Sequence, residues 1–250
     1  MLPCAAIALA QVTSIPHGTL ELIAEKEWVT AGGAVDLGLR FQLEKGWHVY
    51  WINPGDSGEP PRVEWQLPSG LTAGAIEWPT PQRFQTSSSI VDYGYVDSVL
   101  LMVPLHVNAD VEPATAHIGA AVRLLICSHE MCVPGKAQLS LALPVQSQPA
   151  PADTQKADLF RAARKALPQP APANWKFSAL DAKDSFVLSA NFQQIGRRIA
   201  QAIFFPLAES QIENAAPQEL SPQADGFRLS LRKSDQLLRP LDRLQGVLVL

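Results

Sequence analysis

The sequence predicts an all-β fold in which a β-sandwich is followed by a short helical linker and a second, smaller β domain. Three observations predict it. Many short segments alternate apolar and polar residues with a period of two, which is the pattern of half-buried strands. Clusters of glycine, proline and asparagine interrupt these segments at modest spacing, as turns do in a β-sandwich. Two proline- and alanine-rich stretches, residues 145–155 and 168–174, then divide the chain.

The composition limits the classes of protein to which the chain can belong. It has 250 residues, of which 47% are hydrophobic and 18% are charged, so it can bury one or two cores and is not a disordered chain. The net charge is -4 and no dense Lys/Arg run is present, so neither a nucleic acid nor an anionic membrane surface is expected as a partner. No apolar run reaches the roughly 18 residues of a membrane span, so no membrane insertion of this segment is expected.

Residues 1–18 are predicted to be the remnant of an export signal and an N-terminal arm. The segment is short and apolar, and Ala8-Leu9-Ala10 before Gln11 has the small-x-small pattern that signal peptidase accepts. Cys4 then belongs to the discarded part. Export would place the chain in an oxidising compartment, where a cysteine pair can cycle through a disulfide.

The β-sandwich is predicted over residues 19–146. Its expected strands are alternating, aromatic or apolar segments: 19–29, 34–43, 47–53, 63–67, 75–79, 98–107 and 120–127. A linker with one short helix is predicted over 147–173, with Asp153 or Thr154 as its N-cap. Arg161, Arg164 and Lys165 lie near its C-terminal end, where positive charges interact favourably with the helix dipole. The second β domain is predicted over 174–250. The chain stops inside a strand-like run, so we expect the natural protein to continue.

The segment GDSGEP, from Gly55 to Pro60, differs by one residue from the sequence around the nucleophile of trypsin-like proteases. Those proteases place a catalytic histidine and aspartate far ahead of the serine. Here only His17 and His48 precede Ser57. We therefore expect a turn in which Asp and Ser make hydrogen bonds, and not a protease site.

Cys127 and Cys132 are predicted to face each other across a hairpin. The four residues between them are a common hairpin loop length, and apolar β-like runs flank them. Directly opposed residues on antiparallel strands have Cα atoms about 4.5 to 5.5 Å apart, which a disulfide can bridge. Past Cys132 the alternation places polar residues on its own face and leucines on the other: Lys136, Gln138 and Ser140 against Leu139, Leu141 and Leu143.

The residues alone leave three chemical interpretations of this pair open. As a structural staple it would be weak, because closing so small a loop contributes only about 2 kcal/mol. As a redox dithiol it would be suited, because a strained and accessible disulfide is easily reduced. His129 and Glu130 in the loop would then modulate it, since an imidazolium favours a thiolate and a carboxylate opposes one. As a metal site, it could use the soft copper(I) ligands Cys127, His129, Met131 and Cys132.

A set of motifs resembles one known family. In order, they are KGWHVYWINPGDSGEPPRVEW (45–65), IEWPTPQRF (76–84), DYGYVDSVLLMVPL (92–105) and LLICSHEMCVPGKAQLSLALP (124–144). The chain resembles the periplasmic N-terminal region of DsbD-like thiol:disulfide interchange proteins, especially the branch called suppressors of copper sensitivity. FFP and ENAAPQ extend the resemblance into the second domain.

The resemblance implies an immunoglobulin-like sandwich whose catalytic cysteines, Cys127 and Cys132, need neither an organic cofactor nor a metal. It implies partners as well: a membrane-embedded DsbD-like domain, a thioredoxin-like domain and oxidised periplasmic client proteins. In the family the second cysteine forms the intermolecular bond, so Cys132 is expected to react with the partner and Cys127 to resolve. A cap loop shields the pair in the family, and its aromatic-Tyr-Gly motif falls here on Asp92, Tyr93 and Gly94. Because Asp92 replaces the aromatic residue, Phe84 and Ile90 are further cap candidates.

Overall fold

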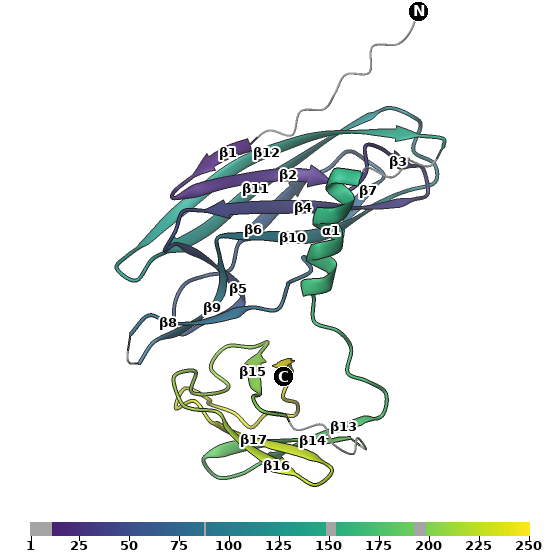
Figure 1. Ribbon diagram of the computed structural model, residues 1–250. Coiled ribbons are helices and arrows are strands. Elements are labelled where there is room, and N and C mark those ends of the chain that lie inside the picture. Colours follow the sequence, from purple (N-terminus) through teal and green to yellow (C-terminus); the bar gives the residue numbers. More distant parts are fainter. Residues whose placement is uncertain (1–11, 88, 149–153, 193–198) are drawn as a thin grey trace, which may run out of the picture. The chain divides into compact units, whose positions relative to one another are not determined.

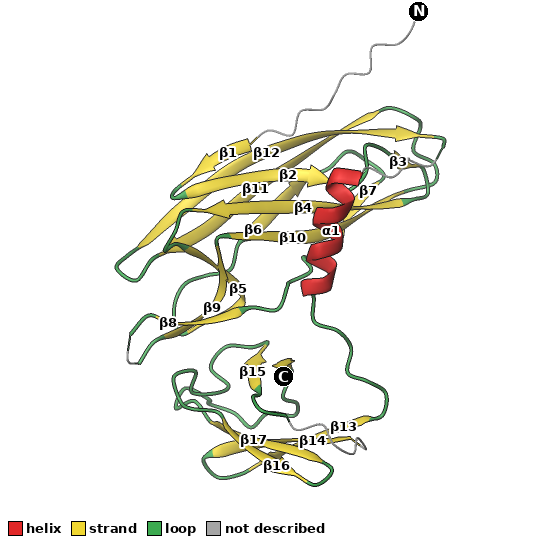
Figure 2. Ribbon diagram, in the orientation of Figure 1, coloured by secondary structure: helices red, strands yellow, loops and turns green. Residues whose placement is uncertain are grey.

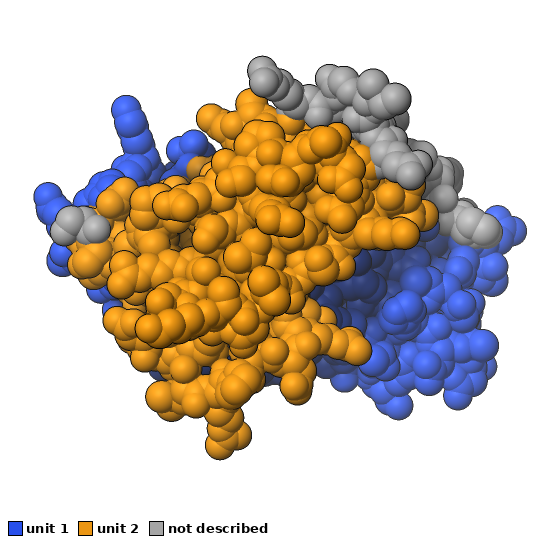
Figure 3. Space-filling model, turned by 90° about the horizontal axis from the view of Figure 1, so that it is seen from below, with its two compact units in different colours: residues 1–49, 60–79, 95–167 blue, residues 50–59, 80–94, 168–250 orange. Residues whose placement is uncertain are grey.

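The computed structural model describes residues 12–87, 89–148, 154–192 and 199–250. The predicted signal remnant, apart from its last residues, and the candidate N-cap Asp153 lie outside the described residues. The chain forms two compact units, coloured separately in Figure 3. Unit 1 comprises residues 1–49, 60–79 and 95–167, and unit 2 comprises 50–59, 80–94 and 168–250. The units therefore interleave along the chain, whereas the domains expected from the sequence follow one another.

Unit 1 contains a five-stranded antiparallel sheet in the order β1-β2-β4-β10-β7. Its strands are β1 (Val12–Ile15), β2 (Gly18–Ala24), β4 (Ala34–Leu43), β10 (Ser98–Val107) and β7 (Leu71–Ala73). The expected segments 34–43 and 98–107 coincide with β4 and β10. Figure 1 shows these strands with the long β11–β12 hairpin beside them.

The second layer of unit 1 is formed by β11 (Thr115–Cys127) and β12 (Cys132–Gln146), which pair along their whole length. Strand β6 (Arg62–Gln66) pairs antiparallel with β11, and β3 (Val29–Thr30) pairs parallel with the end of β12. Every second residue of β11 from Ala116 to Ile126 is buried, and β12 has the same alternation from Ala137 to Val145. Together with the buried positions of β4, these residues form the core of a β-sandwich: Val35, Leu37, Leu39 and Phe41.

The outer face of the first sheet is covered by the helix α1 (Thr154–Ala166), drawn in red in Figure 2. Phe160 is fully buried there and packs against Ile23, Leu100 and Met102. A Cβ atom on Gly38 would lie 3.1 Å from the ring of Phe160, so the missing side chain leaves room for the phenyl group. Strand β10 is therefore buried on both faces, which explains its continuous apolar run.

An ion-pair cluster fixes the last turn of α1. The Arg164 guanidinium donates to both carboxylate oxygens of Glu25, at 2.8 and 2.6 Å, and also binds Asp36. The hydrogen bonds to Glu25 raise the pKa of Arg164 above its usual value. Arg164 and Lys165 lie in the last helical turn, as the sequence predicts. In the part of the chain that the structure describes, no helix is both long and apolar enough to cross a membrane.

Unit 2 combines two segments from the first half of the chain with the C-terminal part. Strand β5 (His48–Gly55) begins in unit 1 and continues in unit 2, where β8 (Gln82–Gln85) and β9 (Val91–Val96) form a hairpin. The C-terminal part holds a four-stranded antiparallel sheet and a separate strand pair. Their order is β13 (Trp175–Asp181), β14 (Ser185–Phe192), β17 (Gly226–Arg232) and β16 (Glu219–Gln223), then β15 (Ile203–Pro206) with β18 (Gly246–Val249).

The strands confirm the prediction of an all-β protein, with corrections in detail. The expected segments of the sandwich omit β1, β7, β8 and β9. The expected strand at 75–79 is wrong, because that segment forms only an isolated bridge from Glu77 to Met102. Pro79 and Pro81 lack the N–H groups that a continuing ladder needs. Strand β16 was not expected, since ELSPQ contains a proline and shows little alternation; it survives as an edge strand of its sheet.

Candidate redox site

The cysteines lie at the tip of the β11–β12 hairpin, where Cys127 and Cys132 are directly opposed and joined by a disulfide. Their Cα atoms are 4.1 Å apart. The backbone N–H of Ser128 donates to the carbonyl of Met131 at 2.8 Å and closes the four-residue loop. The Ser128 hydroxyl oxygen also accepts from the N–H groups of Glu130 and Met131, at 3.2 and 3.3 Å. The hairpin and the opposed cysteines predicted from the spacing are confirmed.

The two sulfurs differ in accessibility. Cys127 is 1% exposed, whereas Cys132 is exposed to solvent. Lys136, Gln138 and Ser140 are exposed with Cys132, while Leu139, Leu141 and Leu143 are buried, so the predicted alternation of β12 is confirmed. A partner can therefore approach one sulfur of the bond and not the other.

His129, Glu130 and Met131 all point away from the core. All three are exposed, and Met131 has 57% of its surface in contact with solvent. Because both cysteine sulfurs are bound to each other, neither is available as a thiolate ligand. Within the described ranges, no group of three or more His, Cys, Asp or Glu residues could hold a metal ion.

His48 joins the cysteines in a row that spans three strands. It is the first residue of β5 and the register partner of Cys127, which is in turn the partner of Cys132. Its side chain is 5% exposed. Burial, followed by the charge of His129, lowers the pKa of His48 to about 4, so its imidazole is neutral at pH 7. The sequence did not identify His48 as a site residue. It precedes Cys127 by 79 positions, and no local sequence pattern indicates that β5 pairs with β11.

Two of the five cap candidates lie in the interior of unit 2. Asp92 is 1% exposed, and its carboxylate accepts hydrogen bonds from the Ser57 amide at 3.0 Å, the Ser57 hydroxyl at 2.9 Å and the Thr86 hydroxyl at 3.1 Å. Burial raises the pKa of this carboxyl. Tyr93 is fully buried, and its ring meets that of Phe205 edge-on at 5.1 Å. Both side chains are thus engaged within their own unit.

The other three cap candidates belong to the same hairpin. Gly94 is buried and pairs with Gln82 across it. Phe84 is half-buried on β8, and Ile90, just before β9, is 37% exposed. Phe84 and Ile90 are therefore the candidates whose side chains are not enclosed by their own unit.

Asn214 ties the β8–β9 hairpin to the C-terminal part of unit 2. Its side-chain oxygen accepts from the Tyr93 hydroxyl at 2.8 Å, and its side-chain nitrogen donates to Asp56 at 2.7 Å. Its carbonyl accepts from Arg83 at 2.9 Å. Asp56 also accepts from the amide of Val91 at 2.8 Å. The turn expected at GDSGEP is present, but its hydrogen bonds reach distant strands.

We expect Asn214→Ala to loosen this hairpin. It removes two side-chain hydrogen bonds and leaves the Tyr93 hydroxyl buried without its acceptor, which costs about 1 to 3 kcal/mol. Amide hydrogen exchange should accelerate in β8 and β9 while β2 and β4 stay protected. Asn191→Ala is the matched control, because Asn191 is exposed on β14. Unchanged exchange in β8 and β9 would show that Asn214 does not hold them.

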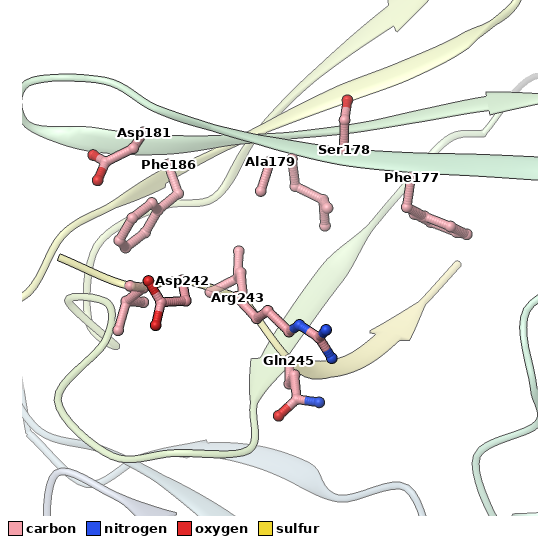
Figure 4. Close-up of a pocket in the computed structure, with 11 residues that line it drawn as sticks. Phe177, Ser178, Ala179, Asp181, Phe186, Asp242, Arg243 and Gln245 are labelled. Carbon is pink, nitrogen blue, oxygen red and sulfur yellow. The ribbon is translucent and has the colours of Figure 1, made fainter.

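Unit 2 also contains an open pocket of about 300 Å³. Figure 4 shows it between the strand that carries Phe177 to Asp181 and the segment with Asp242, Arg243 and Gln245. Phe186, Leu188, Leu241 and Leu244 make much of its lining apolar. None of the candidate redox residues lines it.

Comparisons with known proteins identify the family and the fold of the chain. The sequence model of the family described as thiol:disulfide interchange protein DsbD, N-terminal, matches residues 20–144, which is half of the chain and includes both hairpin cysteines. No curated protein sequence matches the chain. Among solved structures, the N-terminal periplasmic domain of ScsB from Proteus mirabilis superposes with a TM-score of 0.68 at 21% identity, over 96% of this chain and 92% of that chain, which shows a shared fold. The chain belongs to the family of the DsbD N-terminal region.

Proposed function

We propose that this chain exchanges disulfides with partner proteins through Cys127 and Cys132. The observation that carries the proposal is a hairpin disulfide with one enclosed and one exposed sulfur. Exchange requires a sulfur that a partner can reach and a second sulfur beside it that resolves the mixed disulfide. Membership of a thiol:disulfide interchange family supports the same chemistry.

The reduced pair would act as a reductant in two steps. The Cys132 thiolate attacks a client disulfide, forms a Cys132–client bond and releases the first client thiolate. Cys127 then attacks the Cys132 sulfur, which re-forms the intramolecular disulfide and releases the second client thiolate. Two electrons pass to the client, and the two thiol protons end on its sulfurs. Reduction of the pair by a partner dithiol runs the same steps in reverse.

The partners follow from the family and from the expected export of the chain. We propose that the pair receives electrons from a membrane-embedded DsbD-like domain and passes them, in the periplasm, to oxidised proteins, with a thioredoxin-like domain as a further exchange partner. The related structure is a periplasmic domain, which supports that location. Of the five cap candidates we propose Phe84 and Ile90 for the cap role, because their side chains are partly exposed whereas Asp92 and Tyr93 are buried within unit 2. His129 and Glu130 would adjust the charge beside the exposed sulfur.

Thiol titration tests whether the disulfide is reversible. A Cys4→Ser background leaves this pair as the only cysteines. We expect no free thiol in the purified protein, two after mild reductant, and none again after equilibration with oxidised glutathione. A pair that stays reduced in oxidised glutathione would contradict the proposal, and so would one that reduces only after the protein unfolds.

A further inference from the structure

His48 lies in one row with Cys127 and Cys132, and the exchange steps described above give it no role. Directly opposed residues in antiparallel strands place their side chains on the same face, with Cβ atoms about 4.5 to 5.5 Å apart. Cys127 lies between its two register partners, so the imidazole and the Cys132 sulfur flank it from opposite sides. Both His48 and Cys127 are buried, at 5% and 1% exposure.

The resolving step makes a specific demand at Cys127. In the mixed disulfide this cysteine is a thiol, and only its thiolate can attack the Cys132 sulfur. A thiol that is removed from water loses its proton with difficulty, because the thiolate gives up its hydration. A nearby base relieves this, as in cysteine–histidine pairs in which the imidazole takes the thiol proton.

The imidazole of His48 is in the protonation state that this role requires. A neutral imidazole has one ring nitrogen with a free lone pair, whereas an imidazolium has none. Burial, with a smaller electrostatic contribution from His129 in the loop after Cys127, lowers the pKa of His48 and keeps its imidazole neutral at pH 7. As the Cys127 thiolate forms, its negative charge stabilises the imidazolium of His48, and the imidazolium in turn stabilises the thiolate.

We propose that His48 accepts the proton of Cys127 when Cys127 resolves the mixed disulfide, an inference that rests on the proposed exchange function. The S–H bond of Cys127 breaks and its proton moves to the imidazole. The resulting thiolate attacks the Cys132 sulfur, forms the Cys127–Cys132 bond and breaks the bond to the client. The departing client thiolate takes up a proton, either from the imidazolium or from water, and His48 returns to its neutral form.

Ellman's reagent separates the two steps in one reaction. The reduced Cys4→Ser protein releases one thionitrobenzoate when Cys132 attacks and a second when Cys127 resolves. We expect His48→Gln and His48→Phe to slow the second release by about 100-fold, as for the loss of a general base, while the first release stays within about twofold. His117→Gln is the matched control, because His117 is exposed on β11. Added imidazole should restore the second release in His48→Ala, which a packing role would not produce.

The outcomes distinguish this inference from the proposed function. A second release that is unchanged in both His48→Gln and His48→Phe would overturn the role of His48, and so would equal slowing of both releases. Circular dichroism of each variant shows whether the fold is retained. If the wild-type protein reduces no client disulfide but its second thionitrobenzoate release still depends on His48, the exchange function with client proteins fails, and only the role of His48 in closing the Cys127–Cys132 disulfide is supported.

Discussion

Cys127→Ser is expected to accumulate a covalent, reductant-sensitive complex with an oxidised client, whereas Cys132→Ser is expected to form none. In the first variant the exposed Cys132 can still attack, but no second thiol remains to resolve the mixed disulfide. In the second variant the remaining sulfur, Cys127, is 1% exposed and a partner disulfide cannot approach it. The difference should be nearly all-or-none.

Non-reducing electrophoresis after incubation with an oxidised periplasmic protein, or with the thioredoxin-like partner domain, measures the complex. The Cys4→Ser background removes the other cysteine, and the variant that also lacks both hairpin cysteines is the control for non-specific adducts. A complex that forms with Cys132→Ser and not with Cys127→Ser would show that the roles of the two sulfurs are reversed.

Phe160→Ala is expected to destabilise unit 1 by about 3 to 5 kcal/mol, the usual cost of removing a buried phenyl group. The ring is fully buried against Ile23, Leu100 and Met102, and it occupies the space above Gly38. Without it, the helix loses its main apolar contact, and the outer face of β10 becomes accessible to water. Native-state hydrogen exchange of the β10 amides measures the loss.

Phe177→Ala removes the same side chain from a site that is 42% exposed on β13, and it should cost far less. If both variants lose the same free energy of unfolding, the destabilisation by Phe160→Ala does not come from the burial of its ring. If Phe160→Ala leaves the β10 amides as well protected from exchange as in the wild-type protein, packing of α1 does not stabilise unit 1.

The hairpin could be predicted from sequence because its determinants are local. Alternation along β12 placed Cys132 on the exposed face with Lys136, and the four-residue loop placed Cys127 opposite it. The helix could be predicted for the same reason, since its residues lie within one segment and its basic last turn suits the dipole. Strand 75–79 was predicted wrongly because Ile76 and Trp78 suggested a ladder that Pro79 and Pro81 do not support.

Pairing between distant segments could not be predicted in this way. Whether β5 lies beside β11 depends on the summed contacts of many residues, so no local pattern identifies His48 as the neighbour of Cys127. The same holds for Asn214, which belongs to the C-terminal half and yet binds Tyr93 and Asp56. From the sequence alone, Asn214 cannot be distinguished from other polar loop residues, because its partners lie far away along the chain.

By itself, the sequence determined the all-β class, the short helix, the opposed cysteines and the face on which each lies, because periodicity and loop length act over a few residues. The tertiary structure alone decided what covers each face and which distant residues meet at the site. It placed α1 over the first sheet, set His48 beside Cys127 and enclosed Asp92 and Tyr93 within unit 2. These choices depend on long-range packing and on the satisfaction of buried polar groups, which are properties of the assembled chain.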